Sequence, residues 1–375
     1  MYMNLEEFNE LFKKYEDGAL SDDEKRLLER WYNQYAAESE SRVGRSELEE
    51  RLKSIADKIP LRYGAAKIRR ISYRIAAAAA VLIFLSTGAW WFYSRDTAEN
   101  QLVQNDIAPG SNKAVLTLAD GRTIDLSEEQ SGIIVGDDNI SYQDGSALTA
   151  VSDMIKGGRK AALLKLTTPQ GGTYQITLPD GTKVWLNAAS TLKYPSRFIG
   201  KTRKVEISGE AYFEVMPDVH RPFKVLSAGQ EIEVTGTTFN VQVYADEPEI
   251  KTTLVEGSVQ IVNQISKAVR KLQPGEQSTV LDGSTRVSQV DVSEYTAWKD
   301  GLFRYNNQPL EAIMRNVSRW YRIKVIYEDA SLKNERFVGM VSRYSNISGT
   351  LAVLEEVGGV HFTIEGNTVT VSKKL

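Results

Sequence analysis

The chain has 375 residues, of which 42% are hydrophobic and 25% charged, and its formal net charge at pH 7 is −3. This balance is typical of folded domains and argues against a protein that binds nucleic acid through bulk positive charge. Because the sequence has no cysteine and only two histidines, it excludes a disulfide framework and a thiolate site, and we expect neither a metal nor a cofactor.

Residues 1–70 predict a small all-α domain. Apolar residues recur at spacings of three and four over residues 4–15, which places them on one face of a helix. Ser21 to Glu24 has the S-x-x-E form of a capping box and opens a second helix. A third helix is predicted over residues 46–59. A domain of this size is marginally stable alone, so its aromatic faces either pack on one another or are completed by a partner.

The uncharged run at residues 75–94, IAAAAAVLIFLSTGAWWFYS, predicts one transmembrane helix. A helix of roughly twenty residues crosses the ~30 Å hydrocarbon layer of a bilayer. A buried core helix is the alternative, but such helices seldom run so long without a charge or end in an aromatic cluster. Basic residues precede the run, so the positive-inside rule places the N-terminus in the cytoplasm. They are Lys67, Arg69, Arg70 and Arg74, which could instead bind anionic lipid or nucleic acid.

Beyond the span the chain predicts β-structure and contains a repeat. Residues 109–126 (PGSNKAVLTLADGRTIDL) and 169–186 (PQGGTYQITLPDGTKVWL) align without a gap. Each predicts a hairpin, because an alternating strand runs into an Asp-Gly turn and a second alternating strand leaves it. We predict a linker with the first hairpin over residues 95–165, in which the polar segment 127–160 forms a mobile connection or irregular strands.

An all-β domain is predicted over residues 166–297. Short, turn-bounded strands follow one another at spacings near ten residues, which is typical of a sandwich or a curled all-β unit. After the second hairpin, the predicted strands are 204–207, 211–215, 223–226, 231–235, 238–244, 252–254, 258–262, 277–281 and 286–290.

The pattern changes after Trp298, and residues 298–375 predict a compact α+β module. One predicted helix, at residues 309–321, carries apolar residues on a single face, and a second is predicted at residues 347–356. The apolar face consists of Leu310, Ile313, Met314 and Val317. The predicted strands of the module are 302–305, 323–327, 336–340, 360–364 and 368–371.

Six segments of the β domain form longer motifs. They are LPDGTKVWLNAASTLKYPSRF (178–198), SGEAYFEV (208–215), RPFKV (221–225), VTGTTFNVQVY (234–244), LVEGSVQI (254–261) and LQPGEQ (272–277). In this order they strongly resemble the FecR family of membrane-bound anti-sigma factors. The flanking layout is similar to the form found in Bacteroidota, in which a cytoplasmic helical domain precedes the span and a module entered through W-x-x-G-x-F, here Trp298 to Phe303, follows the FecR domain.

The resemblance implies a multidomain regulator and not an enzyme. Members of the family sit in the inner membrane as single-pass proteins, hold an extracytoplasmic-function sigma factor through the cytoplasmic helices, and receive a signal from a TonB-dependent outer-membrane transducer in the periplasm. The residues expected to anchor the sigma factor, unless they form only the internal core, are Leu11, Phe12, Tyr15, Leu27, Leu28 and Trp31. The terminal module resembles the signalling domains of secretins and transducers, with an expected transducer-binding edge at Arg336, Phe337, Val338, Gly339 and Met340.

The bond between Gly236 and Thr237 lies in a motif that matches the site where some FecR relatives cleave themselves. In that reaction the threonine hydroxyl attacks the preceding carbonyl, and water hydrolyses the resulting ester. The same residues also suit a strand, a glycine bulge and a second strand, and we favour this structural alternative.

Two other sets of residues are candidates for chemistry. Glu210 and Glu214 could form an acid/base pair, but we expect them to face solvent with no other group converging on them. Trp185, Trp298 and Trp320 fit either a glycan-binding groove or a packed core. A membrane-tethered protein that binds glycan or cell-wall material is therefore the alternative function. The sequence lacks the usual motifs of nucleotide-binding enzymes, zinc proteases and serine hydrolases, and we expect no enzymatic activity and no direct nucleic-acid binding.

Overall fold

The computed structural model describes residues 106–136, 139–148 and 161–374. The predicted cytoplasmic helices and the predicted span at residues 75–94 lie outside these ranges. The same is true of the six expected sigma-factor contacts, which are Leu11, Phe12, Tyr15, Leu27, Leu28 and Trp31. Among the residues that are described, none belongs to a helix with both the length and the apolar character needed to cross a membrane.

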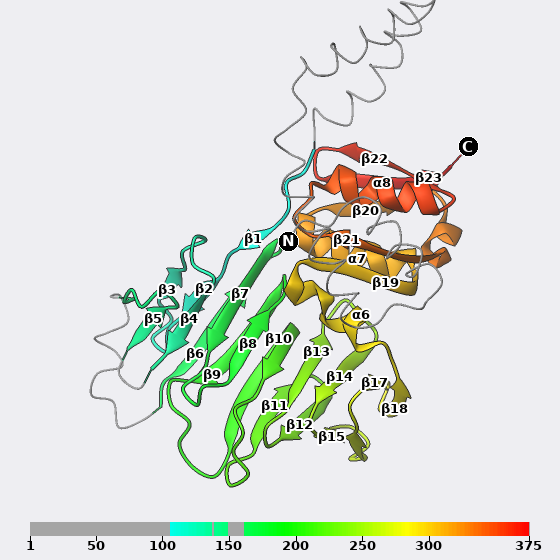
Figure 1. Cartoon of the computed structure of the whole chain (residues 1–375). Helices are drawn as coiled ribbons and strands as arrows, with labels where there is room; N and C mark the ends of the chain where they lie inside the picture. The colour runs from blue at the N-terminus through cyan, green and yellow to red at the C-terminus, as the bar shows by residue number, and fades with distance from the viewer. Residues whose placement is uncertain (1–105, 137–138, 149–160, 375) are drawn as a thin grey trace, which may run out of the picture. The chain divides into compact units, whose positions relative to one another are not determined.

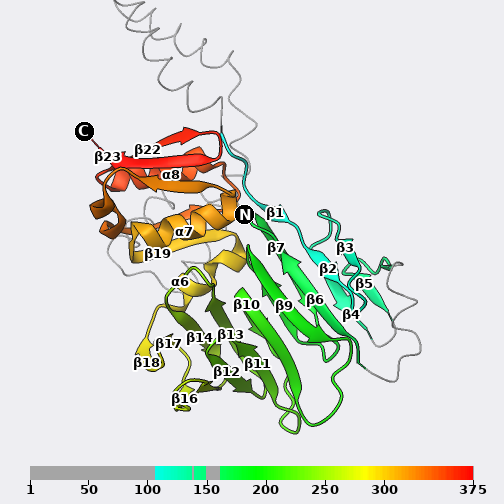
Figure 2. The same cartoon turned by 180° about the vertical axis from the view of Figure 1, so that it is seen from behind.

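The described chain is mostly β-structure and ends in a small α+β part, as predicted (Figures 1 and 2). We call residues 111–289 the β-sandwich and residues 292–374 the C-terminal module. The strands of the β-sandwich are β1 (Ser111–Asn112), β2 (Val115–Thr117), β3 (Thr123–Asp125), β4 (Gly132–Val135), β5 (Ile140–Tyr142), β6 (Leu163–Thr168), β7 (Gly172–Thr177), β8 (Lys183–Leu186), β9 (Ser190–Pro195), β10 (Arg203–Glu214), β11 (Phe223–Ser227), β12 (Gln230–Val234), β13 (Thr238–Val243), β14 (Ile250–Glu256), β15 (Val259–Asn263), β16 (Val269–Leu272), β17 (Glu276–Leu281) and β18 (Ser284–Gln289).

The strands of the β-sandwich form two rows. The first row has the order β3-β2-β6-β9-β10-β11-β12-β15-β16. The second has the order β5-β4-β7-β8-β10-β13-β14-β17-β18. Neighbouring strands are antiparallel except for two parallel pairs, β10 with β11 and β4 with β7. β1 also pairs with β7 in parallel, so the start of the described chain joins the second row.

β10 belongs to both rows and turns from one to the other at Gly209. Its residues before Gly209 pair with β9 and β11, and those from Gly209 onward pair with β8 and β13. Gly209 has a φ of 93°, which a glycine adopts at little cost. A Cβ at this position would lie 2.4 Å from the Ser190 hydroxyl oxygen. The sequence predicted separate strands at residues 204–207 and 211–215, because the glycine interrupts their pattern; the structure has one bent strand instead.

The two copies of the sequence repeat form the predicted hairpins, one in each row. β2 pairs with β3 in the first row, and β7 pairs with β8 in the second. Gly121 and Gly181 occupy the turns with φ values of 88° and 87°, the conformation that the Asp-Gly sequence favours. The described part of residues 127–160 contains β4 and β5, so irregular strands are the correct alternative for that part.

The two rows enclose one apolar core. Along β7 and β9, buried residues alternate with half-exposed or exposed ones, so each strand turns one face inward. Phe213 of β10 stacks on Phe239 of β13 with ring centroids 5.1 Å apart, and neither side chain has exposed surface. Every residue of this core belongs to the β-sandwich. The core therefore needs no residue of the C-terminal module to be complete.

The C-terminal module contains every helix and strand predicted for it. Its elements are α6 (Val292–Thr296), η2 (Ala297–Asp300), β19 (Leu302–Pro309), α7 (Leu310–Tyr321), β20 (Lys324–Tyr327), η3 (Ala330–Asn334), β21 (Arg336–Ser342), α8 (Ile347–Val357), β22 (Val360–Glu365) and β23 (Thr368–Lys373). β19 and β21 form an antiparallel pair. β20, β23 and β22 form a second sheet, in which β20 and β23 are parallel.

The core of the C-terminal module includes residues from other parts of the chain. The predicted apolar face of α7 is buried against both sheets. Ala188, which follows β8 of the β-sandwich, belongs to the same core, and Ile107 packs against it from the start of the described chain. Both views show α6 beside the ends of β13 and β14, with β19 and α7 beyond it (Figures 1 and 2). The module is thus built onto one end of the second row.

Candidate functional site

A ring of buried hydrogen bonds joins the β-sandwich to the C-terminal module. Arg343, which follows β21, donates from Nη2 to Asn187 Oδ1 (2.8 Å), and Asn187 Nδ2 donates to Glu210 Oε2 (2.7 Å). The other carboxylate oxygen of Glu210 accepts from Asn240 Nδ2 (3.0 Å). Asn240 Oδ1 accepts from the indole of Trp298 (3.1 Å), and the Trp298 carbonyl accepts from Arg343 Nη1 (2.8 Å). We call these five residues the junction ring.

The junction ring contains two opposite charges that do not touch. Glu210 is 6% exposed and Arg343 is 2% exposed, and the Asn187 amide lies between them. Burial raises the pKa of Glu210, although the hydrogen bonds from Asn240 and Asn187 oppose this effect. Burial lowers the pKa of Arg343 to about 10, with the negative charge of Glu210 acting in the opposite direction. Burial thus makes each charge costly, and the hydrogen bonds of the junction ring offset part of that cost.

Aromatic rings of the module fix the position of Arg343. Its guanidinium carbon lies 4.0 Å from the ring centroid of Trp320 and 5.3 Å from that of Phe303. The Trp320 indole in turn donates to the Arg343 carbonyl. A planar guanidinium can stack on rings and donate hydrogen bonds in its own plane at the same time. Arg343 thus presents its donors to the β-sandwich from a rigid support.

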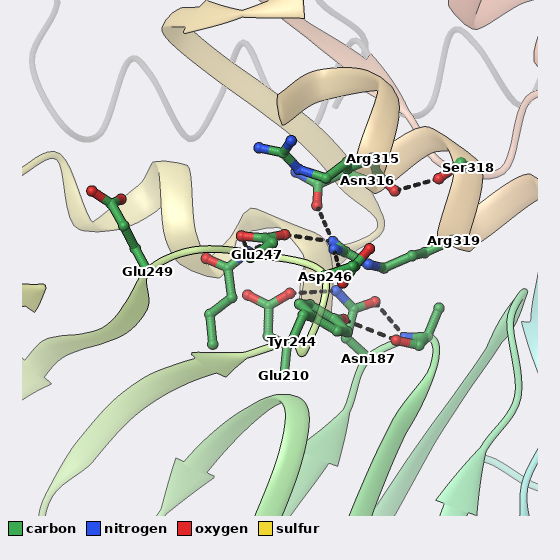
Figure 3. Close-up of polar contacts among 12 residues, drawn as sticks. Asn187, Glu210, Tyr244, Asp246, Glu247, Glu249, Arg315, Asn316, Ser318 and Arg319 are labelled. Carbon is green, nitrogen blue, oxygen red and sulfur yellow. Dashed lines mark hydrogen bonds and ion pairs between the residues drawn. The ribbon is translucent and has the colours of Figure 1, made fainter. Parts of the chain in front are cut away.

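A second arginine clasps the same two parts, as Figure 3 shows. Arg319 of α7 donates to Glu247 Oε1 at 2.7 Å and to Asp246 Oδ1 at 2.8 Å. Its guanidinium carbon lies 3.7 Å from the ring centroid of Tyr244, and the Tyr244 hydroxyl donates to the Ala188 carbonyl at 2.8 Å. Because Arg319 and Glu247 are both buried, their ion pair is shielded from solvent and is stronger than a surface ion pair, whereas the Asp246 side chain is 63% exposed.

A small cavity of about 120 Å³ lies beside the junction ring and is lined by charged residues of both parts. These include Glu210, Glu247, Arg319 and Arg343. Within the described ranges, no cluster of three or more histidine or acidic side chains is arranged to hold a metal ion. The arrangement is suited to holding two parts of a protein in a fixed position, and it brings no nucleophile next to a general base.

The prediction that Glu210 faces solvent was wrong. Glu214 is half-buried, but Glu210 is buried, and Asn187 and Asn240 converge on it. In the first half of β10 buried and exposed residues alternate, whereas after Gly209 both faces are covered. The C-terminal module covers the second face, and local alternation gives no sign of it. The polar residues inside otherwise apolar motifs, such as Asn187 in VWLNA and Asn240 in TTFNV, were the available signal.

The Gly236-Thr237 bond lies directly before β13. Thr237 is 5% exposed, and its hydroxyl donates to the Ser258 carbonyl at 2.9 Å. A Cβ at residue 236 would lie 2.8 Å from Pro217 Cα, so the position requires glycine. This geometry accommodates the favoured strand and bulge arrangement, and cleavage of the bond stays a prediction.

The expected transducer-binding edge is part of β21. β21 pairs with β19 on one side, and no other strand of the described chain pairs with it. Phe337 is buried, whereas Val338 and Met340 are 63% and 52% exposed, and Arg336 is also exposed. Binding at this edge stays a prediction.

The three tryptophans that fit a glycan groove lie around one cavity. Trp185, Trp298 and Trp320 line a space of about 260 Å³ together with Gln175 and Tyr344. Trp320 is only 3% exposed, because it packs against Arg343. Trp298 uses its indole nitrogen in the junction ring. The core-packing interpretation is therefore correct for Trp320, while Trp185 and Trp298 are half-buried.

Comparison with known proteins identifies two family domains in the chain. The family described as FecR protein matches residues 165–260, and the family described as FecR, C-terminal matches residues 302–371. No curated protein is similar enough to count as a match.

Two crystal structures of a candidate anti-sigma factor from Parabacteroides distasonis ATCC 8503 are similar to the chain. The structure at 1.65 Å resolution is 27% identical with a TM-score of 0.52, and the match covers 56% of this chain and 98% of that one. The structure at 2.50 Å resolution is 28% identical with the same TM-score, and the match covers 56% and 99%. The junction ring draws Asn187, Glu210 and Asn240 from the first family domain, and Trp298 and Arg343 flank or belong to the second. The chain therefore contains the two domains of FecR-type proteins, and in structure it is similar to a candidate anti-sigma factor.

Proposed function

We propose that the chain is a single-pass inner-membrane anti-sigma factor. It binds an extracytoplasmic-function sigma factor through its cytoplasmic helices and receives a signal from a TonB-dependent outer-membrane transducer through its periplasmic domains. The proposal is supported by the match to both FecR family domains and by the likeness to a candidate anti-sigma factor. The charge distribution around residues 75–94 supports the orientation, with the N-terminus in the cytoplasm.

The junction ring is the observation that carries the proposal. Its members are three polar residues from the FecR motifs, Asn187, Glu210 and Asn240, together with Trp298 of the W-x-x-G-x-F entry and Arg343 of the module. The junction ring therefore links residues inside the matched FecR domain to the C-terminal module. A receiver of this kind transmits a signal because a partner that moves the module also moves the β-sandwich.

The cytoplasmic part of the proposal is tested with the full-length protein in detergent. We expect Leu27→Asp or Trp31→Ala to weaken copurification of the sigma factor roughly tenfold or more, because buried apolar and tryptophan contacts dominate most helix-in-groove interfaces. Asn33→Ala, two residues further along the same predicted helix, is the matched control and should retain the sigma factor. If the wild-type protein copurifies with no sigma factor from its own cells, the proposal fails.

The periplasmic part of the proposal concerns the exposed edge of β21. Val338 and Met340 project from this strand, and a partner strand that pairs there would cover them. We expect Val338→Lys together with Met340→Lys to abolish the response to a coexpressed transducer domain while copurification of the sigma factor is retained. Leu281→Lys, at another exposed apolar position on the β-sandwich, should leave the response intact.

Self-cleavage at Gly236-Thr237 is a separate part of the proposal. Its support is the motif and the close packing around both residues. Blots of both termini should show two fragments for the wild-type protein and one full-length band for Thr237→Ala. Identical full-length bands for both proteins would exclude cleavage.

A glycan-binding protein is a second candidate function, because Trp185, Trp298 and Gln175 border one cavity. Indole rings and amides together are suited to the apolar faces and hydroxyls of sugars. An array of bacterial and plant glycans probed with the full-length protein tests this candidate. Binding that Trp185→Ala removes would support it, and an array without signal would exclude it.

A further inference from the structure

The start of the described chain is bound to the N-terminus of α8. The Asp106 carboxylate accepts from the Ser348 hydroxyl at 2.6 Å and from the Ser348 backbone N–H at 3.1 Å. One residue further on, the Ile107 carbonyl accepts from the Ile347 N–H at 3.0 Å. Asp106 and Ser348 are 242 positions apart in the sequence. We call these contacts the α8 clamp.

The α8 clamp replaces a local helix cap. The first N–H groups of a helix have no partner inside it, and a side chain just before the helix usually accepts from one of them. Asn346 occupies that position but makes no such hydrogen bond. Asp106 takes over this role, and its negative charge also lies at the positive end of the helix dipole. The end of α8 is therefore completed by a distant segment of the chain.

The same segment continues from the module to the β-sandwich. Gly110 is packed so closely that a Cβ there would lie 2.7 Å from the Trp320 ring. The chain then becomes β1, in which the Ser111 N–H donates to the Gly171 carbonyl at 2.8 Å. The described segment that follows the predicted span in sequence thus contacts the module first, at residues 106–107, and then the β-sandwich, at residue 111.

The exposed edge of the module contacts the C-terminal end of α8 through one buried side chain, and the α8 clamp lies at the other end of the same helix. Phe337 is the buried residue of β21 between exposed neighbours. Its ring lies where a Cβ on Gly358, the residue that ends α8, would be only 2.4 Å away. A displacement of β21 would therefore act on the C-terminal end of α8, and Asp106 is bound at the N-terminal end of the same helix.

We propose that the α8 clamp is a regulatory contact: a partner that binds the C-terminal module changes the hold of α8 on Asp106, and so acts on the segment that leads to the predicted span. This inference rests on the proposed function. It makes the module, and not the β-sandwich, the part that first senses the partner. The clamp is suited to this role because it consists of a few polar contacts at a half-buried position, which can open at low cost compared with an apolar core.

The absence of cysteine in the chain allows a direct test in the full-length protein in its membrane. Asp106→Cys with Ser348→Cys can be joined by a short bifunctional thiol reagent that a reducing agent cleaves. We expect the joined protein to lose the sigma-dependent response to a coexpressed transducer domain and to regain it after reduction. The control pair is Lys193→Cys with Glu206→Cys, which replaces a more exposed polar contact, at 3.3 Å, that lies wholly within the β-sandwich.

The opposite change is to open the clamp. We expect Asp106→Ala with Ser348→Ala to change the sigma-dependent transcript about fivefold or more without any transducer, and to speed hydrogen exchange of the Ile347 and Ser348 amides. Asp106→Asn should have a smaller effect, because its amide oxygen can still accept from the Ser348 N–H while its NH2 group can donate to the Ser348 hydroxyl.

The two proposals fail in different ways. A joined clamp that still allows a normal response overturns the clamp as a regulatory contact and leaves the proposed function intact. The other outcome is that neither the transducer domain nor any variant changes the level of the sigma-dependent transcript. This result overturns the proposed function and the regulatory role together, even where hydrogen exchange shows that the clamp has opened.

Discussion

The β-sandwich and the C-terminal module achieve their stability in different ways. The core of the β-sandwich is made only of its own residues, around the stacked pair Phe213 and Phe239. The core of the module includes Ala188 and Ile107 from outside it, and its contact with the β-sandwich is polar and charged. The comparison indicates that the β-sandwich is the self-sufficient part, while the module keeps its position only as long as specific polar contacts are satisfied.

The largest expected effect is on the β-sandwich core. Phe213→Ala removes a fully buried ring, and we expect it to lower the free energy of unfolding by about 3–5 kcal/mol. Denaturant unfolding of the full-length protein, with hydrogen exchange to separate the two parts, measures this loss. Val219→Ala, at a position 73% exposed, should change the free energy by less than about 0.5 kcal/mol. Equal losses for both variants would contradict a self-sufficient core.

The next effect is confined to the junction ring. Arg343→Met removes two buried charge-assisted hydrogen bonds and one of the positive charges near Glu210, and we expect this to cost about 3–5 kcal/mol. We expect hydrogen exchange to rise in β19 and α7 while β6 and β9 keep their protection. Adding Glu210→Gln should restore part of the loss, because the buried charge is then removed. If exchange rises equally in both parts, the comparison between them is wrong.

A smaller effect is expected at the second clasp. Arg319→Lys keeps the positive charge but cannot bind Asp246 and Glu247 together while stacking on Tyr244. We expect a loss of about 1–2 kcal/mol in the docking of the module, measured by hydrogen exchange in α7. The matched control is Arg304→Lys, because Arg304 is a partly exposed arginine paired with one carboxylate. Its loss should stay below about 1 kcal/mol.

The smallest effect is a dependence on pH. Because burial raises the pKa of Glu210, the folded protein binds this proton more tightly than the unfolded chain does. The contribution of Glu210 to stability is therefore fully present below the ordinary glutamate pKa, and it is lost as the pH rises through the raised value. Glu210→Gln lowers stability by an amount that does not change with pH, because its amide NH2 faces the NH2 of an asparagine and cannot accept a hydrogen bond from it. The substitution removes the pH dependence that comes from Glu210.

The difference in docking stability between the wild-type protein and Glu210→Gln isolates that contribution when it is followed upward from below the ordinary glutamate pKa of about 4.3. Other carboxylates, such as Asp218 and Asp291, have lowered pKa values and change equally in both proteins. A difference that stays constant with pH would mean that Glu210 has the same pKa in the folded and unfolded states.

Local sequence patterns predicted the strands and helices well but not the junction. Alternation and turn residues are local properties, so the two Asp-Gly hairpins and the apolar face of α7 followed from the sequence. Glu210 occupies an outward position of its strand, and it is buried only because a distant module covers it. The α8 helix was placed correctly, but its cap comes from Asp106 rather than from Asn346. Such partners depend on the tertiary arrangement, which alternation does not encode.

The distance along the chain between Asp106 and Ser348 also determines when their contact forms. Closing a flexible loop of 242 positions costs about 5 kcal/mol of chain entropy, whereas each hydrogen bond contributes only about 1 kcal/mol. The contact therefore forms after the intervening residues have folded and brought its ends together. The cap on α8 thus reports that folding of the intervening residues is complete, because a chain that is only partly folded has not yet formed it.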